Sequence, residues 1–124
     1  MTAGRGIIHE EFHSRAFSKE GGLFEMVQLW VNLPKKNKMV KPSYQEIAKK
    51  DIPTISNNKS ILRVIAGEYN NILGPAHTFT EINIYDISSI EKEIISLNFN
   101  SDTNTMILIM SGNVSINKKK YEDK

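Results

Sequence analysis

The chain has 124 residues, of which 40% are hydrophobic and 24% are charged, and this balance is typical of a globular domain rather than a disordered segment. The net charge is only +2 and there is no cysteine, so a broad nucleic-acid-binding face is not expected, and disulfides, thiolate zinc sites and cysteine nucleophiles are excluded. No window approaches the ~20 consecutive apolar residues that a membrane span needs.

The N-terminal part of the sequence alternates with a period of two residues, which indicates β-strands. Residues 6–13 form the first predicted strand and residues 24–33 the second, with Gly21-Gly22 as a turn signal between them. Successive side chains of a strand point to opposite faces. One face of the first strand therefore carries Ile7, His9, Glu11 and His13.

Residues 34–59 have a different character, because they are rich in lysine and are interrupted by Pro34, Pro42 and Pro53. Pro42 and Ser43 are suitable residues to begin a helix over residues 44–50, which Pro53 and the residues before it would end. We interpret this segment as a linker between two β-rich regions.

The sequence after the linker returns to short alternating runs. The predicted strands are residues 61–66, 79–87, 92–97, 105–110 and 114–121. Ser111-Gly112-Asn113 is the predicted hairpin turn between the last two strands. Residues 106–110 are apolar on both faces, which predicts a strand buried between two layers.

The predicted strands indicate an all-β protein, either a sandwich or a barrel. The number of strands does not complete such a fold on either side of the linker. Two strands cannot bury a core, and the region after the linker offers about five. We therefore expect the sequence to be part of a larger protein.

His9-Glu10-Glu11 is the one cluster with metal-ligand character. In a strand, His9 and Glu11 would lie on the same face, about 6.6 Å apart along the chain, and an imidazole and a carboxylate at that spacing can bind one ion. His13 shares the face but lies about 13 Å from His9 along a regular strand, and His77 stands alone. The plain alternative is that both residues are surface residues of an ordinary strand. A zinc-deaminase site is excluded because it needs two cysteines.

Several segments, in order, resemble the pirin family. The resemblance begins with the turn and strand of residues 1–9 and the strand of residues 28–34. It continues through the linker in Lys38-Met39, residues 42–47 and Asp51-Ile52-Pro53, and then in residues 64–68 after the linker. It extends over nearly the whole chain.

The resemblance implies a cupin-type fold, the double-stranded β-helix or jelly roll, in two facing barrels. Residues 1–33 would end the N-terminal barrel, residues 34–59 would be the linker and residues 60–124 would begin the C-terminal barrel. Family members hold one metal, usually iron as Fe(2+), through a His-x-His pair and a later His-x-Glu pair. His9 and Glu11 match the later pair. The earlier pair would precede Met1, so the resemblance implies an internal fragment with an incomplete metal site.

The resemblance also implies two kinds of function. One is a metal-dependent dioxygenase acting on a flavonol such as quercetin. The alternative is a non-enzymatic, iron-dependent redox sensor that binds a transcription regulator or another regulatory protein. The fragment alone is expected to be inactive, to bind iron weakly and to dimerise through exposed strand edges. A third reading is a gene fragment without activity. We expect a cytoplasmic location, or a nuclear one in a eukaryotic cell, because no signal peptide begins the sequence.

Overall fold

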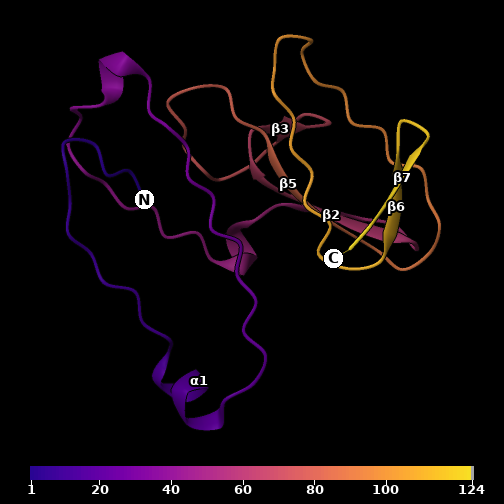
Figure 1. The fold of residues 1–124 in the computed structure, drawn as a ribbon, viewed down its shortest axis with the longest axis horizontal. Coiled ribbons are helices and arrows are strands. Elements are labelled where there is room, and N and C mark those ends of the chain that lie inside the picture. Colours follow the sequence, from indigo (N-terminus) through magenta and orange to yellow (C-terminus); the bar gives the residue numbers. More distant parts are fainter. Residues whose placement is uncertain (124) are drawn as a thin grey trace. The chain divides into compact units, whose positions relative to one another are not determined.

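The protein is described by a computed structural model, and the structure describes residues 1–123. Within these residues the regular elements are mostly short strands, with one α-helix and two 3-10 turns, which confirms the predicted all-β class (Figure 1). The chain forms two compact units, one of residues 1–93 and one that begins at Ile94. The helical elements are α1 (Arg15–Glu20), η1 (Lys35–Asn37) and η2 (Lys49–Asp51), and the strands are β1 (Thr54–Ser56), β2 (Ser60–Ala66), β3 (Glu68–Tyr69), β4 (Ile72–Leu73), β5 (Ile84–Ser89), β6 (Asn113–Ile116) and β7 (Lys119–Glu122).

The core of the first unit is an antiparallel sheet in the order β1-β2-β5. The alternation of β2 directs Leu62, Val64 and Ala66 into the protein, where Val64 and Ala66 are fully buried. On the opposite face, Arg63 of β2 lies between Thr54 of β1 and Asp86 of β5 and forms an ion pair with Asp86. The predicted strand at residues 61–66 is thus confirmed.

A side-chain cap closes the turn between β1 and β2. Asn57 Oδ1 accepts hydrogen bonds from the backbone N–H groups of Lys59 and Ser60, each at 2.7 Å. Asn57 Nδ2 donates to Glu93 Oε1 at 2.6 Å, so the end of the first unit is attached to this turn. The Ser60 hydroxyl and the Asn57 amide both stabilise the carboxylate, and they hold the pKa of Glu93 below its usual value.

This turn predicts an acid-sensitive contribution to stability. A carboxyl whose pKa is lowered in the folded state stabilises the fold above its ordinary pKa, and that contribution disappears as the pH falls through and below this value. We expect the melting temperature of the Glu93→Gln variant to fall less than that of the wild type between about pH 7 and about pH 3.5. Thermal unfolding followed by circular dichroism checks this. Glu91→Gln is the control. If the acid-induced fall in melting temperature were the same in both variants, the role of Glu93 would be contradicted.

The β3–β4 hairpin follows β2 directly. Its turn residues, Asn70 and Asn71, have φ angles of 50° and 64°, the left-handed pair that a two-residue hairpin turn requires. Gly67 enters the hairpin with a φ of +75°. Gly74 follows the hairpin and passes so close to β2 that a Cβ added to it would lie 2.7 Å from Ala66 N. This packing positions the loop of residues 74–79 beside the sheet, where Ala76 bridges Ala66.

The second unit contains a single hairpin within its described residues, β6–β7, and here several predictions are wrong. Residues 92–97 are not a strand, and the hairpin does not turn at Ser111-Gly112-Asn113. The predicted strand at residues 114–121 is folded in two, because Asn117 and Lys118 adopt positive φ angles and form the turn. Residues 105–110 are not a strand. Within the described residues no segment pairs with them, so their apolar side chains are largely exposed, 77% in the case of Met106.

The N-terminal strands and the linker helix also differ from prediction. Residues 6–13 and 24–33 are not assigned as strands, since no neighbouring segment of the described chain forms a ladder with them. The helix α1 lies between them instead: Ser14 Oγ accepts from Phe17 N at 3.1 Å, and Gly21 ends the helix with a φ of 70°. The predicted helix at residues 44–50 is reduced to the 3-10 turn η2.

Candidate metal centre

The segment that leads to the His-x-Glu pair is held by the linker. Thr2 and Ser43 exchange backbone hydrogen bonds of 2.8 and 3.0 Å, and Arg5 N donates to Val40 O at 3.0 Å. Gly4 has a φ of +52°, and a Cβ there would lie 2.1 Å from Val40 O. A residue with a side chain does not fit at this close approach, which explains the glycine.

The linker is in turn attached to the loop before β5 by one side chain. Gln45 Nε2 donates to His77 O at 2.9 Å, and Gln45 Oε1 accepts from His77 N at 2.8 Å. The amide of Gln45 thus pairs with His77 as a backbone peptide would. The sequence analysis missed this residue, because a side chain that binds backbone leaves no periodic signal.

The predicted ligands His9 and Glu11 lie together in the structure. His9 Nδ1 is 3.9 Å from Glu11 Oε1, and both side chains are exposed, at 44% and 62%. The side chains therefore converge, and the pair could hold one ion from two sides. Two donors satisfy only part of the coordination of a catalytic metal, which needs at least three protein ligands.

No third ligand joins this pair within the part of the chain that the structure describes. Residues 1–123 contain no group of three or more His, Cys, Asp or Glu side chains that could hold a metal. His13 instead packs against Phe24 and Phe17, with ring centroids 4.7 and 5.3 Å away. His77 lies in the Gln45 pairing described above. His9 and Glu11 as metal ligands remain a prediction.

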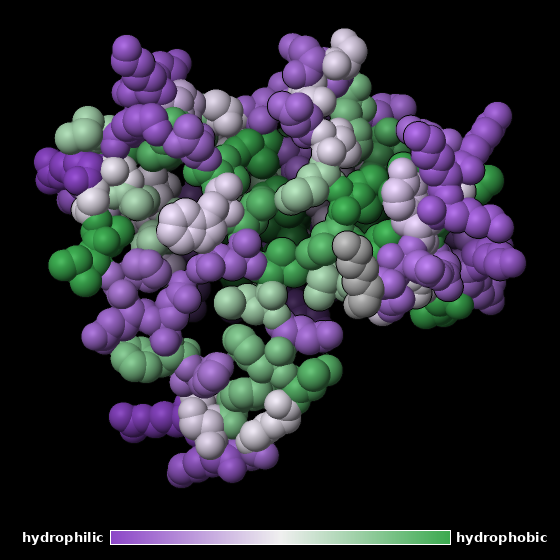
Figure 2. Space-filling model, viewed as in Figure 1, coloured by the Kyte–Doolittle hydropathy of each residue, from purple (hydrophilic) through white to green (hydrophobic). Residues whose placement is uncertain are grey.

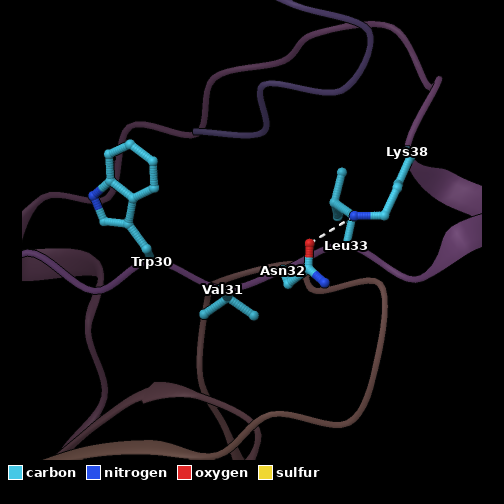
Figure 3. Close-up of a pocket in the computed structure, with 5 residues that line it drawn as sticks. All are labelled: Trp30, Val31, Asn32, Leu33 and Lys38. Atoms are coloured by element: carbon cyan, nitrogen blue, oxygen red, sulfur yellow. Dashed lines mark hydrogen bonds between the residues drawn. The ribbon is translucent and has the colours of Figure 1, made fainter.

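Two hollows open on the first unit. One, of about 280 Å³, is lined by Trp30, Val31, Asn32, Leu33 and Lys38 (Figure 3). The other, of about 320 Å³, is lined by Thr2, Ser43, Gln45, His77, Thr78 and Phe79. Trp30 is 87% exposed, since no described segment covers it. Neither hollow has a lining carboxylate, so neither supplies a metal site.

Comparison with known proteins identifies the fold and the family. The crystal structure of quercetin 2,3-dioxygenase from Acinetobacter baumannii matches 98% of this chain with a TM-score of 0.93 and 45% identity, over 43% of its own chain. A Pseudomonas aeruginosa protein provisionally named quercetin 2,3-dioxygenase is 38% identical over 94% of this chain and 41% of its own. Pirin-like protein 2 of Arabidopsis thaliana is 43% identical over 71% of this chain and 26% of its own. No family model matches the chain.

The structural match defines the class of protein as a cupin-fold β protein, which confirms the predicted fold. The sequence matches then give the family: the chain belongs to the pirin family. It spans less than half of the length of the relatives it matches. Among the described residues, no helix is both long and apolar enough to cross a membrane.

Proposed function

We propose that this chain is the part of a metal-dependent pirin that supplies two ligands, His9 and Glu11, to a metal site, and that the parent activity is dioxygenation of a flavonol such as quercetin. The observation that carries the proposal is the convergence of His9 Nδ1 and Glu11 Oε1, 3.9 Å apart, in a chain 45% identical to a quercetin 2,3-dioxygenase. An imidazole and a carboxylate without thiolate suit iron as Fe(2+), and also manganese, zinc or nickel.

The residues of this chain have a limited task in that mechanism. His9 and Glu11 would hold the ion, and the Thr2–Ser43 and Arg5–Val40 bonds fix the segment that leads to them. A bound iron ion would supply the redox chemistry that a dioxygenase needs. We also propose the division into residues 1–33, 34–59 and 60–124, and a cytoplasmic location.

A second candidate function is a non-enzymatic, iron-sensing co-regulator that binds a regulatory protein. One observation favours it: many large apolar side chains are open to solvent, as the green surface in Figure 2 shows, and such surfaces are typical of protein contacts. The same surfaces suit a homodimer through strand edges.

The ligand count predicts that the chain alone binds Fe(2+) only weakly. We expect anaerobic calorimetric titration to show no one-to-one site tighter than about 10 μM, because two ligands do not hold a catalytic metal. A chimera that adds, at the N-terminus, a segment carrying the His-x-His pair that the family resemblance implies should bind on the order of 100-fold more tightly.

The tightened binding of the chimera should be lost in His9→Ala and in Glu11→Ala, and it should persist in the control His77→Ala. Quercetin cleavage should follow the same pattern if the parent is an enzyme. Tight binding that survives both substitutions would refute the assignment of His9 and Glu11. Iron binding without quercetin cleavage, together with capture of a regulatory protein, would favour the co-regulator.

A further inference from the structure

Positive charge is concentrated in the linker. Residues 34–59 contain seven lysines against Glu46 and Asp51, a net charge of +5, whereas the whole chain carries +2. The remainder of the chain therefore has a net charge of −3. Such asymmetry within one chain points to an interaction with an anionic partner rather than to folding.

The charge is densest in residues 35–41, which we name the lysine loop. It holds Lys35, Lys36, Lys38 and Lys41 and no acidic residue. The loop has a fixed backbone: Asn37 N donates to Pro34 O at 2.8 Å, and Val40 N to Asn37 O at 3.2 Å. Its base is fixed to the N-terminal turn by the Arg5–Val40 bond, which brings the backbone of a further cationic residue next to it.

The charges of the lysine loop are not neutralised by the described residues. All four lysines are exposed, and the ion pairs of residues 1–123 join other residues, His9 with Glu11 and Arg63 with Asp86. Lys38 Nζ donates to the neutral amide oxygen of Asn32 at 2.7 Å (Figure 3). This hydrogen bond orients the Lys38 side chain but does not neutralise its charge. An anion can therefore reach Lys35, Lys36 and Lys41 directly.

Two large non-polar side chains stand among these charges. Met39 within the loop and Tyr44 just after it are each 76% exposed. Methionine and tyrosine are enriched in protein–protein interfaces, where they supply the contact area that charges alone do not. The combination of exposed lysines on a hydrogen-bonded loop with exposed Met39 and Tyr44 suits an occupant that carries both negative charge and apolar groups.

We propose that the lysine loop, with Tyr44, is a docking surface for a short acidic segment of a partner protein that presents an apolar side chain among its carboxylates. A nucleic acid fits less well. Residues 34–59 contain no arginine and a single aromatic residue, Tyr44, so there is neither bidentate phosphate recognition nor a stacking platform. The net negative charge of the rest of the chain would also repel a long polyanion more than a short peptide.

The test uses the whole chain and a fluorescent peptide of about twelve residues, in which glutamates flank a central leucine and phenylalanine. Fluorescence polarisation at about 50 mM and about 150 mM salt should show saturable binding that weakens as salt screens the charges. The double variant Lys35→Glu, Lys36→Glu should lose on the order of tenfold in affinity. Met39→Ser with Tyr44→Ser should lose about threefold to fivefold and leave the salt dependence unchanged.

The matched control is Lys119→Glu, Lys120→Glu, which makes the same change of charge at exposed residues of β7. It should change the affinity by less than about twofold. An equal loss in this control would show that net charge alone attracts the peptide, and would overturn the proposal. So would the absence of saturable binding at the higher salt, or tighter binding of a single-stranded oligonucleotide of equal charge. Since the substituted side chains are exposed, circular dichroism should show unchanged folding.

Discussion

Replacing Gly67 by alanine is expected to destabilise the protein by about 3 kcal/mol or more, which corresponds to a fall of roughly 10 °C or more in melting temperature. Gly67 has a φ of +75°, and an added Cβ would lie 1.9 Å from Asn83 Oδ1 and 2.8 Å from Ile82 O. Asn83 cannot simply turn away, because its Oδ1 accepts a hydrogen bond from Glu68 N. The junction between β2 and the β3–β4 hairpin would therefore have to open.

Gly112→Ala separates this crowding from backbone strain. Gly112 has a similar φ of +82°, but nothing lies within 4 Å of the position of its Cβ. At this position the only cost of the substitution is that of holding an alanine at a positive φ, about 1 kcal/mol. Thermal and urea unfolding should therefore show a clearly larger loss of stability in Gly67→Ala than in Gly112→Ala. Equal losses would show that Asn83 and Ile82 move aside at little cost, and that the close packing at Gly67 is not important.

The Gln45→Ala variant is expected to lose about 1–3 kcal/mol, because it removes both hydrogen bonds to His77 and leaves the linker without its attachment to the loop before β5. Gln45→Glu keeps an acceptor for His77 N and loses the donor to His77 O. It also places a negative charge near that carbonyl. We therefore expect its loss of stability to lie between zero and that of Gln45→Ala, or to equal that of Gln45→Ala.

Hydrogen exchange at the backbone amide of His77 distinguishes the two variants. In Gln45→Ala this amide loses its acceptor and should exchange on the order of tenfold faster, whereas in Gln45→Glu it should stay protected. Gln28→Ala, at an exposed glutamine, is the control and should change neither stability nor exchange. An unchanged His77 amide in Gln45→Ala would show that the pairing does not persist in solution.

The parts of the fold that the sequence predicts are those in which side-chain pattern and burial agree. β2 alternates between buried and outward residues, and its predicted span differs from the observed one by a single residue, Ser60. The all-β class follows from the same signal. The α-helix α1 was missed although it has recognisable signals, a serine cap at Ser14 and glycines after Glu20, because the glycines were interpreted as a turn between strands.

Other differences come from contacts that no local pattern contains. The last hairpin turns at Asn117-Lys118 rather than at Gly112, because two non-glycine residues adopt positive φ there. In the candidate site, His9 Nδ1 lies 3.9 Å from Glu11 Oε1 although residues 6–13 do not form the strand on which the spacing argument depended, and the role of the two residues as metal ligands stays a prediction. The pairing of Gln45 with His77 joins residues 32 positions apart through a side-chain amide, and no sequence rule indicates it.

The contacts that hold the linker also set an order of assembly. The Thr2–Ser43 bridge and the Gln45–His77 pairing each close a long loop, and neither can form cheaply in an unstructured chain, because the entropy of closing a loop must be offset by contacts already made. The hairpin between β3 and β4 and the turn capped by Asn57 close over a few residues. Folding should therefore begin at β2 and its neighbours and reach the His9–Glu11 segment last, so that the candidate ligands are the final part of this unit to become ordered.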